Sequence, residues 1–525
     1  MLTTFHRLVR KYLGTLMQYE VVKFFIMIIT MNFNVNSLPW ISKRSQCRNS
    51  VSNIFVDPGG QLSFSQKYAN MYNTENEQFL QYLASTPKYT TVRVNLKNYK
   101  PQELVDIFRD QLVQRYGESP EVYVHPQLPD CIVLGALSKL SQSVVDHPYQ
   151  IIVDQSCALA VLRGADVFAP GVLAMPVGIP KGTLVSVYGD LARKCLRGQI
   201  APYTHHKVLI ATGEMKMDRY TLFGQSETQP RGVAVEITSN LAGVPHLDIE
   251  PSMGILQNLP SIAAGHYLDV HPGQKVLDMC SAPGNKLTHV AQLMSDTGTL
   301  IALDKSKARL YRLNETLKSL DLCSIQTHLF DSTRIHSSCE EDIERMNLQQ
   351  QSFDRVLLDA PCSGFGQRPM FENELSTLDL NKKIKSHTFI QKKLLEAAIP
   401  LLKSNGILVY CTCSLSLDEN EAMIAWLLQR HPEMELVPTL PRLGSHGLFH
   451  EDLNPEDRAR MQRFGPTVSP DGGPNSDTIG FFLCKLRKKY HSPLASHLDT
   501  HHKTLDSTPS KSERRKSLEK DQKNS

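Results

Sequence analysis

Two cysteines stand in surroundings that suit covalent chemistry. Cys362 lies within residues 359–364, Asp-Ala-Pro-Cys-Ser-Gly, and Cys413 within residues 411–414, Cys-Thr-Cys-Ser. Each segment follows a short apolar run typical of a buried strand, so both cysteines are expected at the carboxyl edge of one sheet. A thiolate there is a nucleophile, but an ordinary cysteine titrates near ~8.5, so the site must favour the anion.

A thiolate at such an edge can activate a pyrimidine base. Carbon 5 of cytosine is a poor nucleophile, but addition of a thiolate to carbon 6 turns the base into an enamine that accepts a methyl group. The proton on carbon 5 must then leave and the thiolate must be expelled, and a second thiol, Cys362, is well placed to help as a base. Asp359 can hydrogen-bond the base near nitrogens 3 and 4, which would select cytosine.

Two other roles compete for these cysteines. A single cysteine is most often a buried apolar side chain. A zinc site is the second alternative, but Cys411 and Cys413 are two residues apart, whereas paired zinc ligands usually stand about three to five apart. No His-x-His or C-x-x-C pair accompanies them, and the adjacent His205 and His206 are remote in sequence and expected on the surface. No metal site is predicted.

The cysteines belong to a region in which strands and helices alternate. Apolar strands are predicted at 275–278, 300–303, 325–330, 356–358 and 407–410. Helical spacing of apolar residues predicts helices over 287–294, 310–320 and 390–401, the last one stopping at Asn405-Gly406. This alternation indicates an α/β fold with a doubly wound, Rossmann-like, mostly parallel sheet.

The first of these strands ends in a loop that suits a ligand. It reads Asp278-Met279, then Cys280-Ser281-Ala282-Pro283-Gly284-Asn285-Lys286, and it leads into a helix. Ligands of doubly wound sheets bind beyond the carboxyl ends of the strands, and Gly284 lets the backbone approach one closely. The loop is neither the G-x-G-x-x-G of dinucleotide sites nor a Walker loop.

Aspartates close four successive strands: Asp278, Asp304, Asp331 and Asp359. A single aspartate in such a place is often a helix cap. An acid that closes the second strand accepts hydrogen bonds from a ribose diol, and the third is placed to accept from an adenine amino group. Together the four predict a pocket for a positively charged ligand that contains a nucleoside. S-adenosylmethionine has both properties.

Composition and length set the frame for these motifs. The chain has 525 residues, 41% apolar and 21% charged, which suits a globular protein of two or three domains. The net charge of +4 is too small to indicate nucleic-acid binding by itself. The 11 cysteines are odd in number and irregularly spaced, which favours free thiols in a reducing compartment over a disulfide framework.

Five segments are predicted along the chain. They are a leader at 1–60, the amino-terminal part of the catalytic region at 61–153, a small inserted β-barrel at 154–240, the main α/β domain at 241–486, and a disordered basic tail at 487–525. Within the second, a strand is predicted at 90–95 and a helix at 103–112. The leader is basic enough for a mitochondrial transit peptide to be a minor alternative to a cytoplasmic location. No membrane span and no obligatory protein partner are implied.

The motifs resemble those of the Nop/Sun-domain RNA cytosine-5 methyltransferases. Residues 278–286, 358–364 and 412–414 carry the resemblance, with Asp477 to Phe482 similar to the last strand of that family and Arg93 to Asn95 similar to its amino-terminal subdomain. The resemblance spans about 65–486. It implies that Cys413 is the nucleophile, that Cys362 promotes product release, and that S-adenosylmethionine is bound by Cys280, Ser281, Ala282, Pro283, Gly284, Asn285, Lys286, Asp304, Asp331 and Asp359.

One position departs from the family pattern. The family usually has Gly-Gly-Lys where this chain has Gly284-Asn285-Lys286. Asparagine tolerates left-handed backbone conformations better than most residues do, so cofactor binding is expected to survive, in a weakened form at most.

The inserted segment resembles a PUA domain, a small RNA-binding barrel, over residues 162–172. A PUA insertion in this architecture is similar to the branch of the family that methylates a cytosine near the 3′ end of the acceptor stem of tRNAs for cysteine and threonine, reading the CCA end with the PUA domain. The resemblance makes Arg163, Lys194 and Arg197 candidates to contact RNA, although surface Lys and Arg look the same in sequence. An rRNA or mRNA substrate, or a catalytically weak RNA-binding protein, are the alternatives.

Overall fold

The computed structural model describes residues 64–224, 230–371, 377–466 and 473–490. The predicted leader and residues 491–525 of the predicted tail lie outside these ranges. The described strands form three sheets, of eight, four and six strands. Among the described residues, no helix combines the length and the apolar character needed to cross a membrane.

The eight-stranded sheet carries both predicted active-site cysteines at the ends of its strands. Its strands are β11 (Lys275–Asp278), β12 (Thr299–Asp304), β13 (Ile325–Leu329), β14 (Phe353–Asp359), β15 (Leu402–Thr412), β16 (Met434–Val437), β17 (Gln462–Phe464) and β18 (Phe481–Lys488). Their order is β13-β12-β11-β14-β15-β18-β16, with β17 beside β18. The strands β13, β12, β11, β14 and β15 are parallel, and β18 pairs antiparallel with β15, β16 and β17. The order in which successive strands are added to the sheet reverses between β11 and β14, and such sheets bind ligands at this point.

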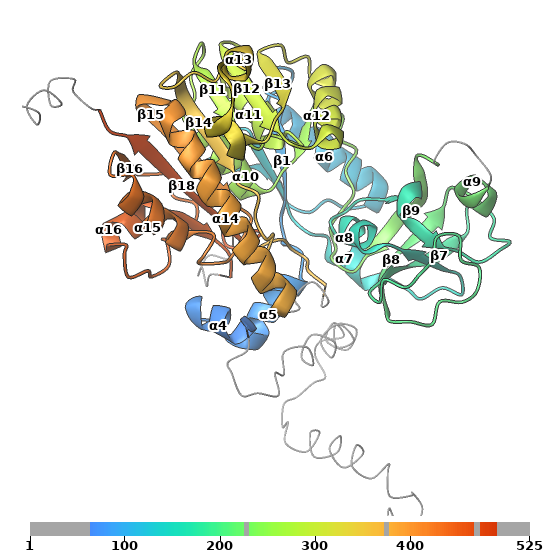
Figure 1. Ribbon diagram of the computed structural model, residues 1–525. Helices are drawn as coiled ribbons and strands as arrows, with labels where there is room; N and C mark the ends of the chain where they lie inside the picture. The colour runs from blue at the N-terminus through green and yellow to red at the C-terminus, as the bar shows by residue number, and fades with distance from the viewer. Residues whose placement is uncertain (1–63, 225–229, 372–376, 467–472, 491–525) are drawn as a thin grey trace, which may run out of the picture. The chain divides into compact units, whose positions relative to one another are not determined.

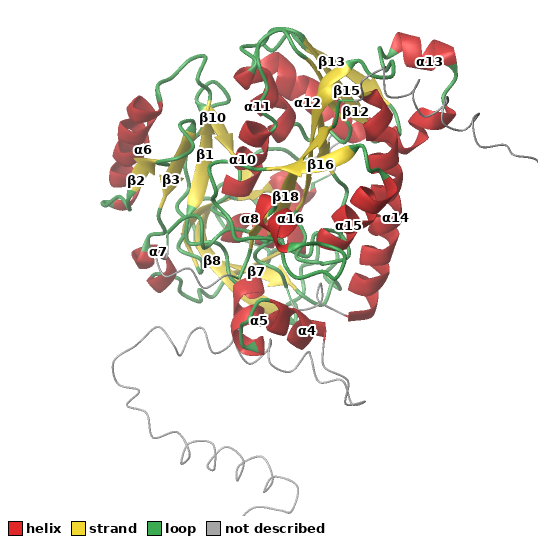
Figure 2. Ribbon diagram, turned by 90° about the vertical axis from the view of Figure 1, so that its left-hand side faces the viewer, coloured by secondary structure: helices red, strands yellow, loops and turns green. Residues whose placement is uncertain are grey.

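Helices cover both faces of this sheet, as Figures 1 and 2 show. One face packs against α10 (Leu259–Tyr267), α11 (Asn285–Leu293) and α12 (Lys307–Ser319); the other packs against η2 (Ser332–Ser337), α13 (Glu340–Arg345), α14 (Thr377–Leu401) and α15 (Glu421–Arg430), with α16 (Pro455–Arg460) nearby. Successive strand residues point to opposite faces, so Val276 joins the first core and Leu277 the second. The predicted doubly wound fold is confirmed.

The amino-terminal region contributes a four-stranded antiparallel sheet and three helices. The sheet order is β10 (Gly254–Leu256), β1 (Thr90–Val94), β3 (Cys131–Leu134), β2 (Val122–Val124). The helix α6 (Pro101–Tyr116), predicted over 103–112, buries Leu104, Phe108 and Leu112 against it. The helices α4 (Phe64–Met71) and α5 (Asn76–Ala84) pack instead against Phe365 and Leu415, beside the loops that carry the two cysteines.

The third sheet forms an inserted β domain, residues 150–240, with a core of its own. Its strands are β4 (Gln150–Val153), β5 (Val167–Phe168), β6 (Val172–Ala174), β7 (Leu184–Asp190), β8 (Lys207–Met215) and β9 (Val233–Asn240), accompanied by α8 (Gln155–Leu162), η1 (Ala169–Gly171) and α9 (Arg219–Phe223), with α7 (Ser138–Gln142) just before it. The order is β5-β9-β8-β7-β4-β6. The sheet includes β4, so it begins before residue 154, because β4 pairs with both β6 and β7.

Three local expectations were wrong. The helix expected to stop at Asn405-Gly406 ends at Leu401, and β15 starts at once, with Asn405 at φ 63° in an irregular stretch where its pairing with β14 shifts. The strand at Ile325–Leu329 is not buried, because β13 is the edge of its sheet.

The last strand also differs from its expected bounds. It begins at Phe481 and not at Asp477, and it runs on through Arg487 and Lys488, two residues of the predicted tail. Pairing with β16 and an ion pair of 2.7 Å between Arg487 and Glu435 hold these residues in the sheet.

Candidate active site

The two predicted thiols meet at the carboxyl edge of the eight-stranded sheet. The Sγ atoms of Cys362 and Cys413 are 3.2 Å apart, within hydrogen-bond distance. The sheet brings them together because β14 and β15 are parallel neighbours, with Asp359 directly opposite Cys411. The residues that follow each strand therefore leave the sheet side by side, and this brings the two sulfurs together.

The contact between the thiols divides their roles. A hydrogen bond from Cys362 lowers the pKa of Cys413 below its usual value, helped by Gln367 and Lys286 and opposed by burial and by Asp359. The same hydrogen bond, together with burial, raises the pKa of Cys362 well above its usual value. The pair therefore favours a thiolate on Cys413 with the proton kept on Cys362.

A lysine and an aspartate flank the thiolate. The Nζ of Lys286 donates to Oδ2 of Asp359 at 2.8 Å, and the Cys411 thiol lies 3.4 Å from Oδ1 of that carboxylate. Burial opposes the charge of Lys286, but Asp359 and Cys411 outweigh it and raise the pKa of the lysine. The Lys286 ammonium also lies 5.3 Å from the ring centre of Phe481. Lys286 thus belongs to the catalytic centre as much as to the cofactor loop.

Buried carboxylates line the adjoining strand ends. Asp278 is 2% exposed, and burial together with Asp359 raises its pKa to about 7. Its Oδ1 accepts from the backbone N–H of Cys280, and among the described residues the carboxylate has no other hydrogen bond. Asp304, also buried, accepts from the backbone of Ala282 and of Ser306. Arg309 lies 3.3 Å from Oδ2 of Asp304, whereas no Lys, Arg or His of the described residues forms an ion pair with Asp278, so Asp278 fits a cationic ligand.

The third acid is placed differently from its neighbours. Asp331 lies two residues beyond the end of β13 and caps η2, accepting from the backbone and the hydroxyl of Thr333. These bonds overcome the effect of burial and lower its pKa. Both bonds use Oδ1, so Oδ2 remains able to accept from a ligand. The residues present therefore fit S-adenosylmethionine. The acids can bind its positive groups and hydroxyls, and the loop at 280–286 can pack against it.

The cofactor loop owes its glycine to packing as well as to backbone conformation. Gly284 has φ 110°, and a Cβ there would lie 2.3 Å from Cδ1 of Leu313. Asn285 is the first residue of α11 and is not among the described residues with positive φ. The expectation that its tolerance of left-handed conformations matters was therefore wrong, because Gly284 alone takes that conformation. The Asn285 carbonyl accepts a hydrogen bond from the buried Arg93.

The three candidate RNA-contacting residues lie in the inserted β domain and differ in their surroundings. Arg163 caps the end of α8. Arg197 donates to the carbonyls of Pro170 and Val172 at 2.8 and 2.9 Å, so it also holds its own domain together. Lys194 is exposed and has no side-chain hydrogen bond or ion pair within the described part of the chain.

Several residues that support the site were missed by sequence reasoning. Glu419 is fully buried and binds the serines that follow both cysteines, and the Asn420 side chain bonds Thr412 and the Ser414 carbonyl. The only signal in the sequence was that Glu419 and Asn420 follow Cys413 closely along the chain. Polar residues there read as an ordinary helix start.

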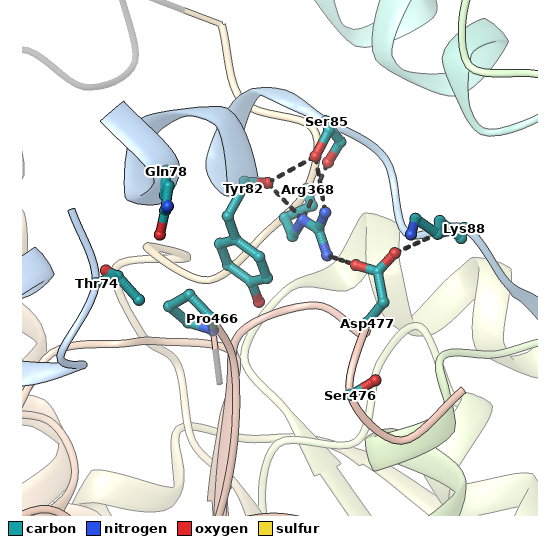
Figure 3. A pocket seen from close by; sticks show the side chains of 9 residues that line it. All are labelled: Thr74, Gln78, Tyr82, Ser85, Lys88, Arg368, Pro466, Ser476 and Asp477. Atoms are coloured by element: carbon teal, nitrogen blue, oxygen red, sulfur yellow. Dashed lines mark hydrogen bonds and ion pairs between the residues drawn. The ribbon is translucent and has the colours of Figure 1, made fainter. Parts of the chain in front are cut away.

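An arginine anchors the loop that follows Cys362. Arg368, 3% exposed, donates to Asp477 at 2.6 Å, to the carbonyl of Thr478 and to the end of α5, and it stacks on Tyr82 (Figure 3). A pocket of about 300 Å³ lies beside it, with Asp477 in its wall. The segment before β18, expected to be strand, thus serves to hold this loop.

One further polar cluster lies behind the cofactor helix. The Nε2 atoms of His266 and His289 each lie 2.7 Å from a different oxygen of Asp130. Burial lowers the pKa of His289 to about 4 in spite of that carboxylate. Among the described residues this is the one group with the spacing of metal ligands. Its hydrogen bonds already join the β2–β3 connection to α10 and α11.

Comparison with known proteins agrees with this geometry. Residues 265–469 match the family described as 16S rRNA methyltransferase RsmB/F. The chain is 36% identical to the mouse tRNA (cytosine(72)-C(5))-methyltransferase NSUN6, over 86% of this chain and 97% of that protein, and 34% identical to the human protein of the same name, over 86% and 98%. The crystal structure of NSun6 from Pyrococcus horikoshii with SFG matches 82% of this chain and 98% of that one, with 26% identity and a TM-score of 0.61.

Fold and comparisons together define a Rossmann-like methyltransferase, with two adjacent cysteines at the carboxyl edge of its sheet. The chain belongs to the Nop/Sun-domain family of RNA cytosine-5 methyltransferases, as its motifs indicated. Its methyl donor is S-adenosylmethionine.

Proposed function

We propose that this enzyme methylates carbon 5 of a cytosine near the 3′ end of the tRNA acceptor stem, in tRNAs of the cysteine and threonine type. The observation that carries the reaction is the 3.2 Å contact between Cys362 and Cys413 beside the carboxylate pocket. The similarity to the mouse and human tRNA (cytosine(72)-C(5))-methyltransferases, which extends over nearly their whole length, supports the substrate.

The Cys413 thiolate adds to carbon 6 of the cytosine, which makes carbon 5 nucleophilic. S-adenosylmethionine, when bound, supplies an electrophilic methyl group. Lys286 and Asp359 lie beside the thiolate, where Asp359 can accept from the exocyclic amine of the base and Lys286 balances the charge. Phe365 and Leu415 are fully buried and hold the loops that follow β14 and β15, while the two thiols stay half-buried and open to a substrate.

Release of the product follows from the same pair of thiols. The charge on Cys413 is one cause of the raised pKa of Cys362. Once Cys413 is bonded to carbon 6 it no longer carries that charge, so the half-buried Cys362 gives its proton to solvent more easily. The Cys362 thiolate can then take the proton from carbon 5 as the bond between Cys413 and carbon 6 breaks.

The inserted β domain is the proposed binding site for the CCA end. It folds around its own core, and its exposed Lys194 is free to meet a phosphate. Arg163 and Arg197 remain candidates for the same role. The RsmB/F match is the specific observation that favours a second candidate, an rRNA substrate with the same chemistry.

The test uses purified protein, labelled S-adenosylmethionine and tRNA transcripts with and without the CCA end. Cys413→Ala should abolish label transfer, whereas Cys362→Ala should accumulate a protein–RNA adduct that survives a denaturing gel. Full turnover by Cys413→Ala, together with no adduct from Cys362→Ala, would reverse the two roles. Equal labelling of rRNA fragments and tRNA would favour the second candidate.

A further inference from the structure

A buried glutamate lies between the loops of the two cysteines. Glu419, fully buried in the turn between β15 and α15, accepts hydrogen bonds from the Ser363 backbone N–H at 2.7 Å, the Ser363 hydroxyl at 2.6 Å, the Ser414 hydroxyl at 2.5 Å and Nε2 of Gln391 at 3.2 Å. Among the described residues no Lys, Arg or His forms an ion pair with it. Burying a carboxylate is costly, and here hydrogen bonds alone offset the cost.

The partners of Glu419 link it to both thiols. Ser363 directly follows Cys362, and Ser414 directly follows Cys413. The two serines come from loops after different strands, yet both hydroxyls bond the same oxygen, Oε2. The distance between the sulfurs therefore depends on this carboxylate as well as on the pairing of β14 with β15.

The charge of Glu419 acts unequally on the two cysteines. It is among the causes that raise the pKa of Cys362, whereas the leading influences on Cys413 are Cys362, burial, Asp359, Gln367 and Lys286. A negative charge nearer to one thiol makes ionisation of that thiol less favourable. The carboxylate thus opposes a thiolate on Cys362 more than one on Cys413.

We propose that Glu419 is a positioning residue for both active-site thiols, which fixes their two loops against each other through Ser363 and Ser414 and holds the shared proton on Cys362, so that Cys413 carries the thiolate. The proposal rests on the roles proposed above for the two cysteines. It concerns the free enzyme and does not depend on which RNA is methylated.

The first experiment measures where the thiolate sits. Glu419→Gln keeps the shape and removes the charge, and the serine hydroxyls can turn to accept from the new amide. The full-length protein is treated briefly with iodoacetamide, without RNA or cofactor, and digested with trypsin. Fragment spectra separate Cys411 from Cys413, which share the tryptic peptide 404–430. The ratio of labelling at Cys413 to that at Cys362 should fall at least about fivefold, since one pKa unit is a factor of about ten.

Asp418→Asn is the matched control, because it removes an acid one residue away that is exposed. Its labelling ratio should equal that of the wild type. A folded Glu419→Gln protein whose ratio equals that of Asp418→Asn would overturn the proposal. Failure of methyl transfer to tRNA in the wild type would instead contradict the proposed function and leave this labelling result standing.

The second experiment tests the link between the loops and is decisive if Glu419→Gln does not fold. Ser414→Ala removes one donor and keeps the charge of Glu419. The kcat for methyl transfer should fall about tenfold, with the KM for S-adenosylmethionine unchanged. A Ser414→Ala enzyme with wild-type kcat, or one that changes only the KM, would overturn the proposal.

Discussion

The carboxyl edge of the eight-stranded sheet and the inserted β domain present their functional side chains in opposite ways. At the sheet edge, groups from β11, β12, β14 and β15 converge on one place, and two sulfurs separated by 51 residues come within 3.2 Å. In the inserted β domain the candidate residues lie on two separate loops, and Arg197 donates hydrogen bonds to the carbonyls of Pro170 and Val172. Neighbouring parallel strands place their carboxyl ends at one edge of the sheet, whatever the loops contain. Residues on separate loops of a binding surface are not brought together in this way.

The largest effect of a single substitution on activity is expected at the carboxyl edge of the eight-stranded sheet. Lys286→Met should lower kcat/KM by about 10² to 10³, because it removes the cation beside the Cys413 thiolate and leaves Asp359 unpaired. Lys286 helps to lower the pKa of Cys413, so its loss raises that pKa. The acidic limb of the pH profile of kcat/KM should therefore move to higher pH.

Lys275→Met is the matched control, a half-buried lysine at the opposite end of β11. Its acidic limb should stay in place. If both variants moved the pH profile equally, the effect of Lys286 would not depend on its place at the carboxyl edge of the sheet.

The next effect concerns the buried acid of the cofactor pocket. The pKa of Asp278 is raised to about 7, above its value in the unfolded chain, so the folded protein holds an extra proton between about pH 4 and 7. Stability without cofactor should therefore fall as the pH rises through that window, by up to about 4 kcal/mol.

Asp278→Asn should remove this fall, since its amide oxygen can still accept from Cys280. The variant should be the more stable protein at pH 8 and should bind S-adenosylmethionine more weakly. Urea unfolding at pH 5 and pH 8, with calorimetric titration of the cofactor, measures both. Parallel pH curves for the variant and the wild type would contradict the charge assignment.

The smallest effects are expected in the inserted β domain, and they sharpen the contrast. Lys194→Ala should weaken tRNA binding about three- to tenfold and lower the slope of its salt dependence by about one, as loss of one phosphate contact does. Melting temperature should not change, because Lys194 has no side-chain partner in the described structure. Binding across a salt series measures this.

Arg197→Ala should behave differently from its neighbour. It removes hydrogen bonds to the carbonyls of Pro170 and Val172, so the domain should lose about 1 to 2 kcal/mol of stability. Thermal unfolding of both variants distinguishes them. Equal stability of the two proteins would mean that Arg197, like Lys194, acts only at the surface.

Most of the catalytic centre could be predicted from the sequence, and the reason lies in β14 and β15. Their apolar runs identify buried parallel strands, and residues just beyond such strands must meet at one edge. The chemistry of Cys362, Cys413 and Asp359 follows from their type and place. The prediction that Asp331 closes the third strand was less accurate. The chain bends after β13 and Asp331 caps η2, and no sequence pattern marks that bend.

The supporting groups could not be predicted, because they act through contacts between segments far apart in the chain. Arg93 on β1 bonds the start of α11, and Arg368 joins the Cys362 loop to α5 and Asp477. Each side chain alone looks like a surface cation. Burial and partners decide its role, and neither is written in local sequence.

The sequence by itself determined the reaction: two thiols, a row of strand-end acids and the alternation that sets them at one edge. Only the tertiary structure decided which thiol keeps the proton, because that depends on a 3.2 Å contact and on charges from Glu419, Lys286 and Asp359 brought in by separate elements. Ionisation equilibria respond to distance and burial, and these exist only once the chain is folded.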